Sequence, residues 1–401
     1  MVQSESYLKR IAFTLIGGKL WVGGYNYQVN LLSVLAIHEK ERIQAFLFLG
    51  NDADNDILNR FTQIIGLEVI QSDIFNAKNT KVRLLKALIW GNDSAALKIF
   101  SNHKIDVVFE AANFYGWRFP IPVIAWIPDF QHRYLSYLFS KYAYWKRELG
   151  FYAQILGGRY IMLSSEDARK DCEYFYKKSI GKTSVVKFAT SAKVIQVDTK
   201  PILALYNLPE HFFFLPNQFW KHKNHKCVID ALKIARDKGH HLVVAVSGKQ
   251  FDPRDSNHFP SLKKLIAENQ LEQSFILLGV IPYQHIQVLM SQCLALINPS
   301  KFEGWSTTVE EAKSLGVPMI LSSLAVHKEQ ASDNADYFDV DSPIELFNIL
   351  LKFKIMKDLH KSILQENSLQ NALNPVTKFA KEFVNLAYLT CSSFDLKKNK
   401  N

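Results

Sequence analysis

The chain has 401 residues, with 48 Lys and Arg against 38 Asp and Glu, and a formal net charge of +10. Hydrophobic residues make up 48% and charged residues 21%, a balance that is typical of a folded globular protein and excludes a disordered one. The basic residues form no run of five or more, so we expect no nucleic-acid partner. Because one domain commonly has ~100–200 residues, the length predicts two domains.

The four cysteines, Cys172, Cys227, Cys293 and Cys391, are too scattered for a disulfide framework or a zinc site. They fit a reducing cytoplasm. No apolar run approaches the ~20 residues of a membrane-spanning helix, and we interpret the short apolar stretch 11–16 as a buried strand and not as a signal peptide. We therefore predict a cytoplasmic protein, and we leave open a peripheral contact with the inner face of a membrane.

Short apolar runs alternate with helical patterns along the first half of the chain. The predicted strands are Arg10–Ile16, Gln44–Leu49, Glu68–Gln71, Asp106–Glu110, Val123–Pro128, Tyr160–Ser164 and Val185–Phe188. The predicted helices are Tyr25–His38, Lys81–Phe100, Leu135–Ile155 and Glu166–Lys177. Continuous apolar strands separated by helices predict a parallel sheet that is covered on both faces.

The second half repeats this alternation. Its predicted strands are Phe212–Leu215, Leu242–Val246, Phe275–Leu278, Ala295–Asn298 and Met319–Leu321. Its predicted helices are Lys223–Lys238, Pro260–Asn269, Tyr283–Gln292 and Thr308–Leu315, with a further helical pattern from about Leu346 to Leu389. We therefore predict an α/β chain of two Rossmann-like, doubly wound domains that face each other across a cleft.

We expect the border between the two domains within Ser191–Pro209, a stretch of poor periodicity that contains two prolines. This divides the chain into residues 1–195, an acceptor-binding domain, and 196–375, a nucleotide-sugar-binding domain. Residues 376–401 are expected to form a C-terminal helix and a polar tail, and we leave open that the helix packs back on the first domain.

A polar segment with two unexplained glutamates follows one of the buried strands. Phe302–Glu311 reads F-E-G-W-S-T-T-V-E-E and leads into a helix. Thr307 as the N-cap and Glu310 three residues later have the spacing of a capping box, so helix capping accounts for both. Capping does not account for Glu303 and Glu311. Loop N–H groups and a helix N-terminus form a pocket that suits a diphosphate.

This segment resembles the E-x7-E element of the family-4 retaining glycosyltransferases, which have the GT-B fold. The flanking sequences N-P-S and E-A-K-S-L-G-V-P-M-I-L-S match as well. The resemblance implies that Glu303 lies beside the transferred sugar and that Glu311 holds the ribose of the nucleotide. It also implies that Gly304, Trp305 and Ser306 line the phosphate and the sugar with backbone groups.

A basic segment, Phe212–His225, follows the first strand of the second domain and opens the next helix. Cations at this place would stabilise a departing diphosphate, although a solvated basic loop has the same composition. The segment resembles the G-R-x4-K-G element of the family, with Lys223 at the Lys position and Asn217 where the family has Arg. Since Asn217 supplies no charge, we expect Lys223 first and Lys221 second to bind the diphosphate, with Gln218 as a neutral helper.

Glycines follow the first strand of the first domain, in the stretch Gly17–Gly24. They allow a ligand to approach the backbone closely, and a simple flexible turn is the alternative. In related glycosyltransferases a similar pair of glycines lies against the donor phosphate and the acceptor, and Gly23 and Gly24 match it best.

The strand Val123–Pro128 leads into Asp129 and His132. The family often has His-Asp here, with the His near the reacting sugar. This chain has Pro128 at the His position, so His132 is a candidate substitute and Asp129 a second catalytic candidate. A histidine that only bonds to backbone or solvent is the alternative. The next stretch, Tyr134–Arg147, interleaves aromatic and basic residues, which fits core packing or a seat for a lipid-linked acceptor.

The predicted function is the transfer of a sugar from a nucleoside diphosphate sugar to an acceptor hydroxyl with retention of configuration, in the assembly of a polysaccharide or glycan. The acceptor is expected to be a glycan or a lipid-linked glycan. We expect no cofactor and no metal ion, since we find no Asp-x-Asp pair in a plausible metal-binding loop, and the pair Asp52 to Asp54 is far from the donor motif in sequence. The alternatives are a GT-B nucleotide-sugar epimerase, an inverting transferase, and a catalytically weakened protein that binds nucleotide sugars or glycans.

Overall fold

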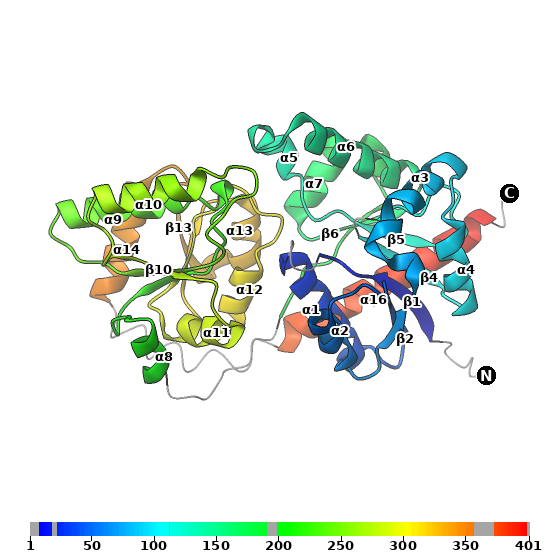
Figure 1. The fold of residues 1–401 in the computed structure, drawn as a ribbon, viewed down its shortest axis with the longest axis horizontal. Helices are drawn as coiled ribbons and strands as arrows, with labels where there is room; N and C mark the ends of the chain where they lie inside the picture. Colours follow the sequence, from blue (N-terminus) through cyan, green and yellow to red (C-terminus); the bar gives the residue numbers. More distant parts are fainter. Residues whose placement is uncertain (1–7, 18–21, 112, 191–198, 357–372, 399–401) are drawn as a thin grey trace. The chain divides into compact units, whose positions relative to one another are not determined.

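A computed structural model describes residues 8–17, 22–111, 113–190, 199–356 and 373–398 of the chain. The chain divides into two compact units (Figure 1). The first unit comprises Met1–His132, Phe139–Phe188 and Asn374–Asn401. The second unit comprises Arg133–Leu138 and Ala189–Leu373.

The first unit contains a parallel sheet of seven strands in the order β3-β2-β1-β4-β5-β6-β7. The strands are β1 Lys9–Thr14, β2 Ile43–Leu49, β3 Glu68–Gln71, β4 Val107–Ala111, β5 Val123–Trp126, β6 Tyr160–Leu163 and β7 Thr183–Val185. The helices are α1 Val22–His38, α2 Asn55–Thr62, α3 Thr80–Trp90, α4 Ser94–Asn102, α5 Gln131–Tyr134, α6 Lys141–Leu156, α7 Glu166–Phe175 and α16 Leu373–Lys398. Short 3-10 turns lie at Asp73–Phe75, Ala77–Asn79 and Lys177–Ser179, and the turn Ser136–Leu138, directly after α5, belongs to the second unit.

Both faces of this sheet are covered, because the central strands β4 and β5 are buried at every position. Ala12 of β1 and Val108 of β4 pack with α4 through Phe100. The residues that alternate with them, Phe13 and Phe109, point to the opposite face. The two-residue period of a strand therefore supplies each face with its own apolar set.

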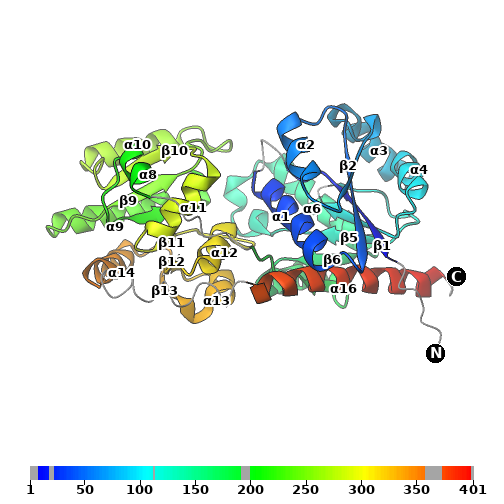
Figure 2. The same cartoon turned by 90° about the horizontal axis from the view of Figure 1, so that it is seen from below.

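The C-terminal helix α16 packs on this second face, as Figure 2 shows for the long red helix. Phe383 of α16 stacks on Phe13 with ring centroids 5.8 Å apart, and it contacts Phe109 edge-on at 5.4 Å. The hydroxyl of Tyr388 donates to the carbonyl oxygen of Arg42 at 3.0 Å. The end of the sequence thus completes the core of the unit in which the sequence begins.

The second unit contains a parallel sheet of six strands in the order β10-β9-β8-β11-β12-β13. The strands are β8 Phe213–Leu215, β9 Val244–Ser247, β10 Phe275–Gly279, β11 Leu296–Asn298, β12 Met319–Ser322 and β13 Ala335–Phe338. The helices are α8 Lys200–Leu205, α9 His225–Asp237, α10 His258–Glu268, α11 Tyr283–Gln292, α12 Thr307–Ser314, α13 Ala325–Ala331 and α14 Pro343–Ile355. Short 3-10 turns lie at Lys221–Lys223 and Ser332–Asn334.

Alternation along β8 separates two cores in this unit. Phe213 and Leu215 pack in a cluster with α9, α10 and α14. Phe212 and Phe214 pack in the other cluster, with α11 and α12. Both predicted sheets are therefore confirmed as parallel and covered on two faces.

Two predicted helices are shorter than their apolar patterns suggested. The predicted helix 81–100 is two helices, because Gly91 has the left-handed φ of 71° and Asp93 caps α4 by accepting from the N–H of Ala96. The predicted helix 135–155 starts later as α6, where Ser140 accepts from the N–H of Ala143. Local capping residues therefore set the ends of these helices, and the apolar periodicity extends beyond them.

Two strands at sheet edges were predicted less well. The predicted strand 185–188 lies at Thr183–Val185, and β13 was not predicted. Edge strands carry a weaker apolar signal, since β7 is only half-buried throughout. Part of the expected domain border, 191–198, lies outside the described residues. In the described parts of the chain, no helix combines the length and the apolarity needed to cross a membrane.

Candidate functional site

The strand order of the second unit indicates a ligand site at the loops after β8 and β11. From β8 the chain moves outward through β9 and β10, and from β11 it moves the other way through β12 and β13. β8 and β11 are neighbours, so the order reverses between them. Ligands of such sheets bind outside the carboxyl ends of the strands at this reversal. Both loops carry predicted site residues.

A buried ion pair joins the two loops. Nζ of Lys223, after β8, lies 2.6 Å from Oε1 of Glu303, after β11. The side chains are only 14% and 9% exposed. Burial by itself raises the pKa of Glu303, but the charge of Lys223, the neighbouring His327 and hydrogen bonds outweigh it and lower the pKa to about 2. Glu303 is therefore a carboxylate at any physiological pH.

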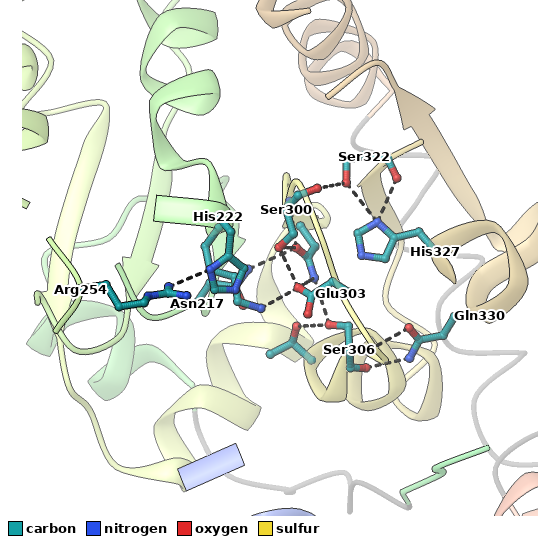
Figure 3. Close-up of polar contacts among 12 residues, drawn as sticks. Asn217, His222, Arg254, Ser300, Glu303, Ser306, Ser322, His327 and Gln330 are labelled. Carbon is teal, nitrogen blue, oxygen red and sulfur yellow. Dashed lines mark hydrogen bonds and ion pairs between the residues drawn. The ribbon is translucent and has the colours of Figure 1, made fainter. Parts of the chain in front are cut away.

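Further hydrogen bonds fix the carboxylate of Glu303, as Figure 3 shows at its centre. The hydroxyl of Ser300 lies 2.7 Å from Oε1 of Glu303. Asn298, the last residue of β11, donates its amide to Oγ of Ser306 at 2.9 Å. Asn217, in the loop after β8, is buried and donates its amide to Oδ1 of Asn298 at 3.3 Å. Asn217 thus acts as a neutral bridge between the loops.

The start of α12 differs from the capping box that its sequence predicts. The helix begins at Thr307, so Ser306 and not Thr307 is the N-cap, and the Ser306 hydroxyl bonds to the side chain of Thr308 at 3.1 Å and not to a backbone N–H of the first turn. The carboxylate of Glu310 instead accepts from Gln330 at 3.0 Å and from Lys313 at 3.1 Å. The prediction failed because Gln330, which is distant in sequence, supplies these residues with other partners. The N-cap side chain therefore leaves the N–H groups of the first turn for a ligand.

Glu311 lies in the second turn of α12. Its Oε1 accepts a hydrogen bond of 2.9 Å from the hydroxyl of Tyr283, at the start of α11. Burial raises the pKa of Glu311 to about 7, and the Tyr283 hydroxyl opposes this shift. Gly304 and Trp305 lie in the loop before the helix and are partly exposed. The two glutamates thus have opposite pKa shifts, although they lie on one loop and helix.

The second predicted cation, Lys221, points elsewhere. Its Nζ lies 3.2 Å from Oδ2 of Asp255, and about half of its side chain is exposed. Lys221 and Lys223 belong to one short turn, so the turn directs Lys223 to Glu303 and Lys221 to Asp255. This difference favours Lys223 as the cation of the site.

Sequence reasoning missed an arginine beside this turn. Arg254 follows β9, and Asp252 accepts from its Nε at 3.1 Å. Nη2 of Arg254 lies 3.1 Å from Nδ1 of His222, the residue between the two lysines (Figure 3). Asp252 is buried and also accepts from the backbone N–H of Lys221 at 2.9 Å. The Asp-x-Arg pair directly after a strand was the signal that could have identified it.

His327 was also not predicted. It lies in α13, is fully buried and has Nδ1 2.9 Å from the carbonyl oxygen of Ser322, so Nδ1 donates and Nε2 is left as an acceptor. Nε2 is buried and has no hydrogen-bond partner among the described residues. Burial lowers the pKa of His327, although the negative charge of Glu303 opposes this shift.

The predicted residues of the first unit form no comparable cluster. Gly23 and Gly24 lie in the first turn of α1, where Gly24 is buried, and the residues between 17 and 22 lie outside the described parts. Asp129 accepts from the N–H of Gln131 at 2.9 Å, and Arg147 lies 2.7 Å from the same oxygen. These two partners hold the turn that follows β5.

His132 lies inside the first unit. The ring is fully buried, and its Nε2 lies 2.5 Å from Oε1 of Glu148 on α6. Phe139, Tyr144 and Phe151 surround the ring with centroids 5.3–6.3 Å away. Burial lowers the pKa of His132, while Glu148 opposes the shift. Glu148 and the aromatic rings thus hold His132 inside the first unit, and its catalytic role stays a prediction.

The described residues contain no group of three or more His, Cys, Asp and Glu side chains that could hold a metal ion. All four cysteines are free and buried.

Comparison with known proteins gives a family match within the second unit. Residues 204–364 match the family model of glycosyl transferases group 1. The O-antigen chain mannosyltransferase RfbU of Salmonella typhimurium is 26% identical over 161 residues, which are 37% of this chain and 43% of that protein. The aligned part thus spans less than half of that relative.

Solved structures resemble nearly the whole chain. A glycosyltransferase from Rickettsia africae has a TM-score of 0.72 at 14% identity, over 96% of this chain and 99% of that one. HepE of Anabaena in complex with UDP-glucose has a TM-score of 0.63 at 15% identity, over 98% of this chain and 100% of that one. At these identities the similarity concerns the fold alone.

Proposed function

We propose that this chain, which has the GT-B fold and matches the glycosyl transferases group 1 model over residues 204–364, transfers a sugar from a nucleoside diphosphate sugar to the hydroxyl of a glycan or lipid-linked acceptor. The observation that carries the proposal is the Lys223–Glu303 ion pair, which lies where the strand order of the second unit reverses. A cation, a carboxylate and a helix N-terminus meet there, as a donor diphosphate and its sugar require.

The donor diphosphate binds Lys223 and the N–H groups at the start of α12. Lys223 has only Glu303 as its charged partner in the described structure, at 2.6 Å, so a bound diphosphate competes for the same ammonium group. Negative charge grows on the leaving diphosphate during transfer, and Lys223 stabilises it without a metal ion. The backbone of Gly304, Trp305 and Ser306 lines the phosphate and the sugar.

Glu311 accepts hydrogen bonds from the ribose hydroxyls of the donor. A carboxylate has enough lone pairs for two vicinal hydroxyls beside the hydrogen bond of 2.9 Å that Glu311 accepts from the hydroxyl of Tyr283. Glu303 lies beside the transferred sugar. Its low pKa keeps it ionised, so its negative charge stabilises the positive charge that develops on the sugar during transfer. We also propose that the configuration of the sugar is retained, because the spacing of Glu303 and Glu311 resembles the E-x7-E element of retaining glycosyltransferases.

The first unit binds the acceptor in this proposal. Gly23 and Gly24, in the first turn of α1, and Asp129, after β5, follow the carboxyl ends of their strands. RfbU is named for mannose transfer in an O-antigen chain, and HepE was solved with UDP-glucose, which supports a sugar donor on UDP or a related nucleotide and a polysaccharide product.

The first experiment identifies the donor. Purified protein is heated with a panel of nucleoside diphosphate sugars, and we expect one or two of them to raise the melting temperature. Each stabilising donor is then tested for slow hydrolysis and for transfer to glycan acceptors. A panel that neither stabilises the protein nor is hydrolysed contradicts the proposal.

The second experiment separates the roles of the two glutamates. We expect Glu311→Gln to weaken donor binding and Glu303→Gln to retain binding but slow transfer. Equal donor affinity in the wild type and Glu311→Gln would overturn the ribose assignment. The anomeric NMR signal of the first product tests retention, and an inverted product contradicts it.

A second candidate is a protein that binds nucleotide sugars without efficient transfer. The buried, neutral Asn217 favours it, because that position carries Arg in the family it resembles. In that case a donor stabilises the protein, but neither hydrolysis nor transfer follows at any acceptor concentration.

A further inference from the structure

We propose that helices α3 and α6 of the first unit, together with Trp117, form a surface that docks on an anionic lipid bilayer. We name this the α3–α6 surface, and it consists of Val82, Leu85, Ile89, Trp90, Trp117, Tyr142, Trp145, Leu149, Tyr152 and Leu156, with Lys81, Lys86, Lys141 and Lys146. It lies outside the donor site, so its function is independent of the proposed reaction.

Helix α6 exposes an apolar stripe. Tyr142, Trp145, Leu149, Tyr152 and Leu156 are 47–78% exposed, although all five are apolar or aromatic. Their spacing of three and four residues places them within an arc of about 80°, at about 100° per residue. A stripe of this kind normally faces a protein core, and here it faces outward.

Lysines flank this stripe on both sides. In the helical projection, Lys141 lies about 20° beyond one edge of the stripe and Lys146 about 40° beyond the other. Both lysines are exposed. Glu148, the one acidic residue of α6, is buried against His132. The exposed charge of α6 is therefore positive.

Helix α3 also exposes apolar residues beside lysines. Val82, Leu85 and Ile89 are 53–62% exposed and lie within an arc of about 60°, and Leu84, Leu88 and Trp90, outside this arc, are 39–63% exposed. Lys81 and Lys86 lie next to the arc and are exposed. The helix contains no acidic residue. Two helices from different parts of the sequence thus share one unusual combination of exposed apolar residues and flanking lysines.

Trp117 connects the two helices. A Cβ on Gly91, directly after α3, would lie 2.7 Å from Nε1 of Trp117, so the indole covers the end of that helix. Trp117 also lines one cavity with Gly157 and Gly158, directly after α6. Trp90 and Trp117 are 63% and 47% exposed. The exposed apolar residues of α3 therefore continue through Trp117 to the end of α6.

The chemistry of the surface selects a lipid bilayer over other occupants. Tryptophan and tyrosine favour the boundary between head groups and acyl chains, where one part of the ring is apolar and the other is hydrated. Lysines beside an apolar stripe fit the negative surface of a bilayer, and each contributes to binding. A second copy of the chain would present the same positive charges, which repel each other.

Vesicle sedimentation tests this proposal. The full chain is mixed with vesicles of phosphatidylcholine alone or with one quarter phosphatidylglycerol, at 50 and 500 mM salt, without any donor. We expect binding to the anionic vesicles to exceed binding to the neutral ones by at least about tenfold at low salt and to fall at high salt. Equal binding to both, or no binding to either, would overturn the proposal.

Matched variants assign the binding to the α3–α6 surface. Trp145→Ser with Leu149→Ser removes apolar area, and Lys141→Glu with Lys146→Glu reverses charge. We expect each pair to weaken vesicle binding at least about tenfold with an unchanged melting temperature, because these side chains are exposed. The controls are Ile65→Ser, at a residue that is 93% exposed, and Lys233→Glu with Lys263→Glu in the second unit. Controls that weaken binding as much as the tests refute the assignment.

Light scattering at several protein concentrations, without lipid, tests the alternative occupant. If the wild type dimerises and Trp145→Ser with Leu149→Ser abolishes the dimer, the surface belongs to a second copy and the bilayer proposal is wrong. A monomer in both cases supports the bilayer. These measurements need no donor, so a failed transferase assay and a failed vesicle assay are distinguishable.

Discussion

The opposite pKa shifts of the two glutamates predict that donor affinity depends on pH through Glu311 alone. Burial raises the pKa of Glu311 to about 7, while the pKa of Glu303 is about 2 and that of the buried His327 is lowered. A nucleoside diphosphate sugar has no group that titrates between pH 6 and pH 8. In the proposed donor site the ionised carboxylate of Glu311 accepts from both ribose hydroxyls, so donor binding favours the loss of its proton.

The sign and the size of the effect follow from this requirement. Below pH 7 most of Glu311 is protonated, so a donor must displace the proton, and affinity rises as the pH increases. With a pKa of about 7, one protein in about eleven has the carboxylate at pH 6 and nearly all have it at pH 8. We therefore expect the dissociation constant to fall about tenfold from pH 6 to pH 8 and to level above that.

Isothermal titration with the donor identified by thermal stabilisation measures this profile. Glu311→Gln should bind weakly with no pH dependence over this range. Tyr283→Phe should shift the midpoint to higher pH, because the Tyr283 hydroxyl donates to the carboxylate at 2.9 Å and lowers its pKa. His222→Gln is the control, because His222 lies in the same turn as Lys221 and Lys223, and it should leave the pH dependence of donor binding unchanged. A flat wild-type profile, or an unchanged slope in Glu311→Gln, would refute the reasoning.

Four further predictions follow from single features of the structure. Lys223→Met should weaken donor binding at least about tenfold in a calorimetric titration, whereas Lys221→Met, whose ammonium faces solvent and Asp255, should change it less than about threefold. Arg159→Met should lower the free energy of unfolding by about 3–5 kcal/mol in urea, because it leaves the fully buried carboxyl of Glu110 without its partner; a loss below about 1 kcal/mol contradicts a buried pair. Gly248→Ala should lower the melting temperature by several degrees, since φ is +148° and the new Cβ would lie 2.4 Å from a backbone oxygen. Removal of divalent ions with a chelator should leave transfer unchanged, and loss of activity that Mg²⁺ or Mn²⁺ restores would refute metal independence.

The sequence by itself determined the fold class. Runs such as 212–215 are apolar at every position, and helical patterns separate them, so a parallel sheet covered on both faces was the arrangement that buries them. Capping residues refined the boundaries, as at Ser140 before α6. The edge strand β13 escaped prediction, because its half-buried positions need fewer apolar residues.

The sequence also determined which residues are candidates for the donor site. Glu303 and Glu311 stood out because helix capping did not require them, and the resemblance to known glycosyltransferases rested on their spacing. Their roles remain proposals that the two glutamate variants test. The pKa of each glutamate could not be predicted from the sequence, because it depends on neighbours that are distant in sequence.

Only the tertiary structure decided those neighbours. It placed Lys223 against Glu303, 80 residues away, and it turned Lys221 toward Asp255. It buried His132 against Glu148, although both residues look equally able to face a ligand in the sequence. The physical reason is that a pKa and an ion pair depend on distance and burial, which the folding of the whole sheet sets, whereas capping and periodicity act within a few residues.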